Sequence, residues 1–223
     1  MNSDPQIDDL PSVVYLFPID QFLLLPETKL SAAITNPRFC RIVDAAEAAD
    51  GYIGVVQVRE RSSSGKEVSL YGVGCLGRVH VHSRDEEKHE VTLEGVIRFR
   101  LLETMNLGSK EDFPKAVVDY REFAADLSRV EEKIEGLDLE NFQATLIQMM
   151  EKVDPSFDLS PLKAMSARQL LRSLAQVIRL TPAEKQKILE APAFKEMAEV
   201  FFLLLTMNFL TTTQDTSPPS QVN

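Results

Sequence analysis

The chain has 223 residues, 44% of them hydrophobic and 26% charged, which is the composition of a globular protein able to bury a substantial core. Its formal net charge is −10. Nucleic acid and anionic membrane surfaces are disfavoured as partners, because the sequence contains no cluster of Lys and Arg to neutralise phosphate groups.

The two cysteines, Cys40 and Cys75, are far apart in the sequence and form no CxxC pair. Neither a zinc site nor a redox pair is indicated, and we expect free thiols, as in cytosolic proteins. The first ten residues carry acids and lack the apolar run of a signal peptide. We therefore expect a cytoplasmic location.

The first half of the chain has the pattern of strands. Short apolar or β-branched runs predict strands at residues 13–17, 22–25, 29–34 and 52–58. Between the third and fourth, Asn36 followed by Pro37 is typical of a helix start, and Gly51 is expected to end that helix.

The next strands alternate between apolar and polar residues at 79–82, 91–93 and 97–101, and a last strand is expected at 115–120. Gly72, Gly74 and Gly77 lie inside the strand pattern that leads into residues 79–82, and they indicate the bulges or bends of a small barrel. A charged turn at 84–88 predicts antiparallel pairing. In the expected register, Val79 faces Leu93, Val81 faces Val91 and His82 faces Glu90.

Beyond Phe123 the apolar period becomes helical, at residues 127–137, 142–149 and 170–178. Thr181 and Glu184 form a capping box with Pro182 at the first helical position, and Pro192 is expected to begin the last helix. Residues 197–210 are apolar but too short for a membrane span, so a buried helix is expected. Residues 211–223 are polar and aperiodic.

Strands first and helices second predict an α+β fold. The expected units are a β-rich lobe at residues 10–123, a helical lobe at 124–211 and a tail at 212–223. We find no internal repeat.

Several motifs follow one another in a specific order: LFPID at 16–20, LLLP at 23–26, NPRF at 36–39, IGVV at 53–56, GVGCLGRV at 72–79, VTLEGVIRFR at 91–100 and LTPAEKQKIL at 180–189. Together they resemble the Lon protease N-terminal (substrate-binding) domain family over residues 10–211. Glu27 stands where that family usually has Gly, and Thr35 and Asn36 replace Phe-Glu.

The resemblance implies a PUA-like small β-barrel with one helix, followed by a C-terminal helical bundle that helps engage substrate polypeptides. The ATPase motif GxxxxGK[ST] does not occur, because Gly65-Lys66 lacks both the upstream Gly and the following Ser or Thr, and a Ser–Lys protease region has no room. A stand-alone member without catalysis, cofactor or metal is therefore expected.

Candidate chemistry competes with ordinary structural roles. His80 and His82 share a strand face with His89 nearby, which would suit a metal, but the solvent face of a meander, shared with Arg98 and Arg100, is the expected alternative. Cys75 is expected to fill the core rather than act as a nucleophile. The acidic runs at 85–87 and 131–135 are expected to be solvated.

The helix at 197–210 is apolar almost all round, so its second face must be covered by the core, a second copy or a client chain. The leading hypothesis is a polypeptide-binding module, in protein quality control, that buries an extended apolar segment between barrel and helices and pairs with it at a barrel edge. Phe201, Phe202 and Phe209 are the candidate anchors. The partners left open are a protease, a chaperone and a homodimer; the alternative functions are a hydrolase and a PUA-like RNA-binding module.

Overall fold

A computed structural model describes residues 6–20, 22–61, 68–85, 88–106, 113–128, 138–153 and 160–214, with only the backbone at 152–153 and 208–214. Six strands form one sheet: β1 (Val13–Ile19), β2 (Lys29–Ile34), β3 (Tyr52–Arg61), β4 (Val68–Arg84), β5 (His89–Met105) and β6 (Lys115–Asp119). The α-helices are α1 (Pro37–Ala49), α2 (Leu139–Val153), α3 (Ser160–Lys163), α4 (Ala167–Val177), α5 (Pro182–Glu190) and α6 (Phe194–Gln214), with short 3-10 helices η1 (Ile7–Asp9) and η2 (Arg121–Leu127). The α+β prediction is confirmed.

The strands pair in the order β2-β5-β4-β3-β1-β6, and β5 also pairs with β6. Five strands therefore close a ring through β5, β4, β3, β1 and β6, while β2 lies outside it along the first half of β5. The β1–β3 pair is parallel, and the other pairs are antiparallel. β5 can pair with three neighbours because it is 17 residues long and carries one bulge opposite β4, at Val96, and one opposite β6, at Leu102.

The expected register between β4 and β5 is confirmed at two positions and wrong at the third. Val79 pairs with Leu93 and Val81 with Val91. Glu90 pairs with Ser83, because a bulge between Val81 and Ser83 removes His82 from the ladder.

Local signals fix the helix starts. Asn36 caps α1 by accepting from the Arg38 amide, with Pro37 in the first turn. The Thr181 and Glu184 capping box starts α5 as expected. Gly51 has φ 77° just beyond α1, the left-handed conformation that glycine adopts at low cost. α6 begins two residues after Pro192 and continues to Gln214, so residues 211–214 are helical and not part of a tail.

Three sequence predictions need correction or lie outside the described residues. Residues 22–25 are not a strand, although Leu23, Leu24 and Leu25 are almost fully buried. β1 continues through Pro18 to Ile19, as a strand can where the proline amide is not needed for pairing. Residues 129–137 and 215–223 lie outside the described ranges.

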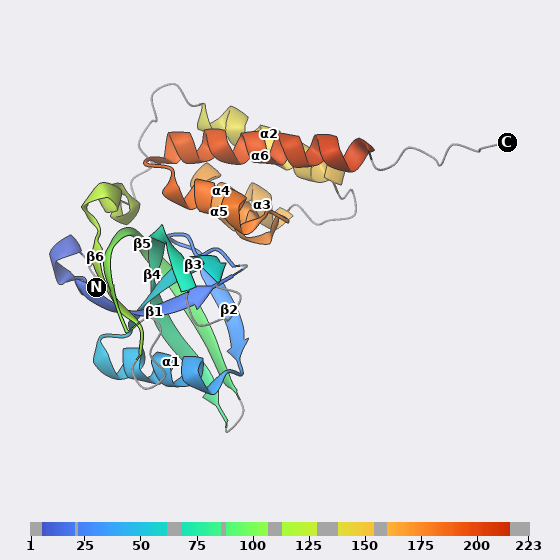
Figure 1. Cartoon of the computed structure of the whole chain (residues 1–223). Coiled ribbons are helices and arrows are strands. Elements are labelled where there is room, and N and C mark those ends of the chain that lie inside the picture. The colour runs from blue at the N-terminus through green and yellow to red at the C-terminus, as the bar shows by residue number, and fades with distance from the viewer. Residues whose placement is uncertain are drawn as a thin grey trace.

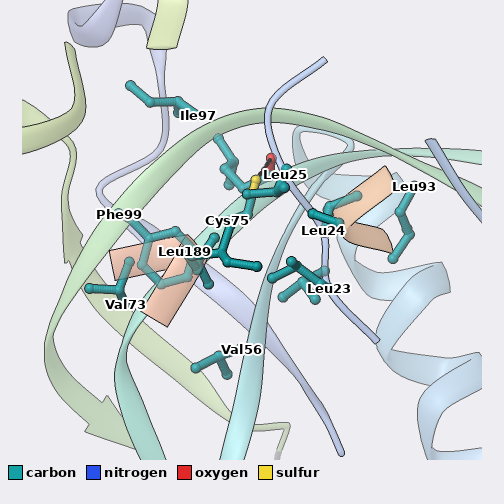
Figure 2. Close-up of a cluster of buried hydrophobic side chains, with 14 of the residues drawn as sticks. Leu23, Leu24, Leu25, Val56, Val73, Cys75, Leu93, Ile97, Phe99 and Leu189 are labelled. Atoms are coloured by element: carbon teal, nitrogen blue, oxygen red, sulfur yellow. Dashed lines mark hydrogen bonds between the residues drawn. The ribbon is translucent and has the colours of Figure 1, made fainter. Parts of the chain in front are cut away.

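The helices form two groups around the strands (Figure 1). α1 lies on one side, and α2 to α6 lie on the other, with α4 and α5 between the strands and the outer pair α2 and α6. One hydrophobic core runs through both groups. Leu23, Leu24 and Leu25 pack there beside Cys75, Leu93 and Leu189, which joins the helices to the strands (Figure 2).

Candidate functional site

The outer helices α2 and α6 enclose a groove with a volume of about 560 Å³, which we call the α2–α6 groove. Both helices pack on α4, and the edge-to-face contact of Phe142 with Phe194, with ring centroids 6.5 Å apart, bridges them. The groove is lined by Asp138, Asn141, Phe142, Thr145, Ala198, Glu199, Phe202, Leu203 and Thr206.

α6 presents two different apolar faces. Its inner face is buried in the core and consists of Phe194, Met197, Ala198, Phe201, Leu204 and Leu205. Its outer face keeps Phe202 at 38%, Leu203 at 58% and Met207 at 55% of their full exposure. A surface helix of a globular protein usually buries its apolar stripe and exposes polar residues, so this outer face is a candidate interaction surface.

The polar side chains of the groove leave its floor apolar. The hydroxyl of Thr145 donates to the Asn141 carbonyl and that of Thr206 to the Phe202 carbonyl, both at 2.8 Å and both within their own helix. Asp138 accepts from the Asn141 amide at 3.0 Å and caps α2. The floor can therefore take an apolar side chain without leaving these hydroxyls unsatisfied.

A buried polar cluster joins the strands to α4, α5 and η2. Arg98 on β5 donates from Nε and one terminal nitrogen to the Asp126 carboxylate, at 2.8 and 2.9 Å. Another Arg98 nitrogen donates to the Leu189 carbonyl at 3.1 Å and to the Ala191 carbonyl at the end of α5. Arg98 and Asp126 are 2% and 7% exposed, so each buried polar group has the other as a hydrogen-bond partner, and Arg98 has the two carbonyls as well.

The expected solvent exposure of Arg98 is therefore wrong. Alternation along β5 correctly puts Arg98 on the face away from the interior of the ring, but α5 and η2 cover that face. Arg100, two residues on, is half exposed and forms a bidentate ion pair with Glu122 at 2.8 Å.

Arg172 on α4 is the second buried arginine of this cluster. It pairs with Glu27 and lies 3.8 Å from Asp126, and burial lowers the pKa of its guanidinium. Glu27 has φ 60°, a conformation that favours glycine, the residue that the family resemblance leads one to expect here. The ion pair with Arg172 gives a physical reason for a carboxylate at this strained position.

Glutamine side chains complete the contact between strands and helices. Gln57 donates to Gln186 at 3.1 Å, and Gln186 donates to the Val73 carbonyl at 3.2 Å. Gln176 on α4 donates to the Leu23 carbonyl at 3.1 Å and to Thr28 at 2.8 Å. These bonds hold the 22–28 segment and α5 in place by directional contacts in addition to apolar burial.

The three histidines do not converge. His80 bonds to Glu94 at 3.1 Å, His82 to the Thr92 hydroxyl at 2.8 Å, and His89 to Asp44 at 3.1 Å. The expected contact of His82 with Glu90 is wrong, because the bulge moves it. Within the described ranges, no group of three or more His, Cys, Asp or Glu side chains is placed to hold a metal ion.

Both cysteines are free and buried. Burial raises the pKa of the Cys75 thiol well above its ordinary value, and the charged groups that act on it are Asp126, Arg98 and Arg172. A nucleophilic cysteine needs a lowered pKa and access to solvent, and Cys75 has neither.

Of the acidic runs, Asp85 accepts from the Lys88 amide at 2.6 Å, while residues 86–87 and 131–135 lie outside the described ranges.

The three candidate anchors have different positions. Phe201 is 1% exposed and packs in the core. Phe202 lines the α2–α6 groove, and Phe209 lies on α6 where only the backbone is described. The α2–α6 groove differs from the expected groove between barrel and helices, because it is lined by residues 138–145 and 198–206 and by no strand residue.

Sequence reasoning missed most of the groove. Phe142 and Leu146 share one helical period, which indicates a buried face but cannot show that Phe142 also reaches the groove. Leu203 lies in an apolar run that is buried on one side only. Asp126 and Arg172 carried no local signal, because their partners are distant in sequence.

An α+β chain with an apolar groove between surface helices has the features of a binding domain. The family model of the ATP-dependent protease La (LON) substrate-binding domain matches residues 13–206. The chain therefore belongs to this family, and the resemblance found in its motifs is confirmed.

Individual relatives agree with this assignment. A Lon protease of Syntrophus aciditrophicus (strain SB) is 25% identical over 205 residues, covering 85% of this chain and 24% of the relative. The chain thus spans about a quarter of the length of that curated relative.

Solved structures share the fold. The N-terminal domain of Mycobacterium avium complex Lon protease is similar with a TM-score of 0.65 and 14% identity, covering 87% of this chain and 98% of that one. A Lon N-terminal domain protein from Xanthomonas campestris has a TM-score of 0.59 and 15% identity, covering 88% and 98%.

Within the described ranges, none of the helices, α6 included, has the length and apolarity needed to span a membrane.

Proposed function

We propose that this chain is a non-catalytic module that binds extended polypeptide segments in the α2–α6 groove, and that it acts in protein quality control. The observation that carries the proposal is the exposed apolar face of Phe202 and Leu203 beside an apolar groove. Membership of a family described as a substrate-binding domain of a protease supports a polypeptide as the ligand.

The size of the groove suits this ligand. A volume of about 560 Å³ lies within the range of small-ligand pockets and accepts one or two large apolar side chains. The peptide backbone would remain at the surface, as in other helical grooves that take apolar anchors from a bound segment. Of the anchors expected from the sequence, Phe202 is the one that we place in contact with the ligand.

A barrel-edge contact remains part of the proposal. β2 pairs with β5 alone among the described strands, and most of its residues are exposed. Such an edge can add a strand from an extended partner. We also propose that the ring of five strands is a PUA-like barrel, which the closed pairing supports.

The binding test uses two matched phenylalanines. Phe202 and Phe22 are 38% and 57% exposed, and only Phe202 lines the groove. A fluorescein-labelled 12-residue peptide with a central Leu-Phe pair is titrated with wild type, Phe202→Ala and Phe22→Ala, and the affinity is read from anisotropy. Truncating a buried phenyl contact removes about 1.5–3 kcal/mol, so Phe202→Ala should bind about ten- to a hundredfold more weakly.

Phe22→Ala should bind like wild type. Equal affinity of all three proteins would reject the groove as the binding site, and no saturable binding by wild type would reject the function. The non-catalytic part is tested separately. The purified chain should neither hydrolyse ATP nor cleave casein, and turnover that co-purifies with the protein through successive columns would contradict it.

A further inference from the structure

The charged side chains among the described residues that line the α2–α6 groove are both acidic. Its lining contains the carboxylates Asp138 and Glu199, on opposite helices, and no Lys, Arg or His among the described lining residues. Glu199 is exposed on α6, and Asp138 sits at the amino end of α2. Any segment seated on the apolar floor therefore has a carboxylate on each side.

Neither carboxylate is neutralised by a basic side chain within the described part of the chain. Asp138 accepts one hydrogen bond, from the Asn141 amide, and Glu199 forms no ion pair with another described residue. The formal net charge of −10 adds a field of the same sign over the whole molecule. A cationic side chain beside the groove would be attracted by both the local and the overall charge.

We propose that the polypeptides bound in the α2–α6 groove are segments in which large apolar side chains are flanked by Lys or Arg. The apolar residue fills the floor formed by Phe142, Ala198 and Phe202, and the flanking cations face Asp138 and Glu199. This substrate class rests on the proposed function. It adds a charge requirement that the apolar surface alone does not impose.

The same charges disfavour a second copy of this chain as the occupant. A symmetric contact through α6 would bring the Glu199 carboxylates of both copies to one interface. Like charges facing each other at an interface destabilise it. A cationic peptide meets the opposite situation, because the groove offers it two partners.

The test compares three labelled peptides that share a central Leu-Phe pair and carry two Lys, two Ser or two Glu on each side. At low salt the Lys peptide should bind about fivefold tighter than the Ser peptide, and the Glu peptide more weakly than both, because exposed ion pairs each contribute about 0.2–1 kcal/mol. The preference should shrink at 1 M NaCl, where charges are screened within about 3 Å.

Variants separate the local carboxylates from the overall charge. Asp138→Asn with Glu199→Gln removes both carboxylates, while Asn keeps the capping of α2. This double variant should lose most of the Lys preference. The control Glu60→Gln with Glu103→Gln removes the same net charge at exposed strand positions and should keep the preference for the Lys peptide.

Each outcome has one meaning. Equal binding of the three peptides by wild type, or equal loss of preference in both double variants, overturns the charge proposal while the binding function stands. Absence of binding by every peptide overturns the function itself. Sedimentation could instead show a dimer that Phe202→Ala abolishes and that excess peptide does not dissociate. That result would assign the groove to a second copy and overturn the proposal.

Discussion

A single residue, Asp126, links three parts of the fold. Its carboxylate accepts from the Arg98 side chain and from the Arg98 backbone amide at 3.1 Å, and Arg172 approaches within 3.8 Å. These groups come from β5, η2 and α4, so one carboxylate holds the strands and the helices together. Removing it leaves two buried guanidinium groups with one fewer partner.

Asp126→Asn should lower the free energy of unfolding by about 3–5 kcal/mol, because breaking a buried ion pair leaves an uncompensated charge. The matched control is Asp20→Asn, which breaks the exposed pair of Asp20 with Arg61 and should cost less than about 1 kcal/mol. Urea unfolding followed by circular dichroism gives both values. Equal effects of the two substitutions would show that Asp126 has no special role.

Cys75 is expected to be inert in the folded chain. Burial raises the pKa of its thiol, so the native state keeps the proton at pH values where an unfolded cysteine, with a pKa of about 8.5, loses it. The stability that this proton contributes is present below about pH 8.5 and declines as the pH rises above it. Ellman's reagent at pH 8 should react slowly with the native chain and quickly in urea. Rapid native reaction at a site mapped to Cys75 by mass spectrometry would contradict this placement.

At the scale of elements, the 22–28 segment shows why an apolar run need not be a strand. Leu23, Leu24 and Leu25 are as buried as strand residues, but the chain leaves the sheet here and crosses β5 at Gly95. The Glu27 amide donates to the Gly95 carbonyl, and the Gly95 amide donates to the Thr28 carbonyl, both at 2.8 Å. The local sequence predicts burial, whereas the crossing depends on a glycine about 70 residues away.

Gly95→Ala should destabilise the fold by at least about 1–3 kcal/mol, because a Cβ there would lie 2.0 Å from the Leu25 carbonyl oxygen. Gly72→Ala is the control, since its Cβ would lie 3.7 Å from Arg100, an ordinary contact. Thermal unfolding of the two variants should differ clearly. Similar melting temperatures would mean that the crossing can shift without cost.

The other elements differ in whether nearby or distant residues determine them. Helix starts at Asn36 and Thr181 were predictable because a cap and its amide lie within three residues. The His82 bulge, the parallel β1–β3 pair and the covering of Arg98 were not, because each depends on distant segments. Periodicity identified the helical face of Phe142 but could not separate core from groove.

At the scale of the whole molecule, the order of strands and helices determined the α+β class, and the motif order determined the family. The site is a property of the assembled helices. α4 and α5 occupy the space beside the strands, so the apolar surface of α6 that remains exposed faces α2. An apolar run alone does not show which of its phenylalanines are exposed. Phe201 is buried in the core, whereas its neighbour Phe202 reaches the surface.

Binding of polypeptide over the outer face of α6 can be followed with a tryptophan reporter. The chain contains no tryptophan, so Leu203→Trp introduces a single reporter in the α2–α6 groove, and Leu102→Trp places the same reporter on β5 at an equal exposure of 58%. Titration with the Lys-flanked Leu-Phe peptide, itself free of tryptophan, should shift the emission of the Leu203→Trp variant to shorter wavelength in a saturable manner, because binding removes the indole from water. The Leu102→Trp variant should not respond. A saturable shift from the Leu102→Trp variant alone, or no shift from either variant while the peptide binds by anisotropy, would show that the peptide does not bind over the outer face of α6.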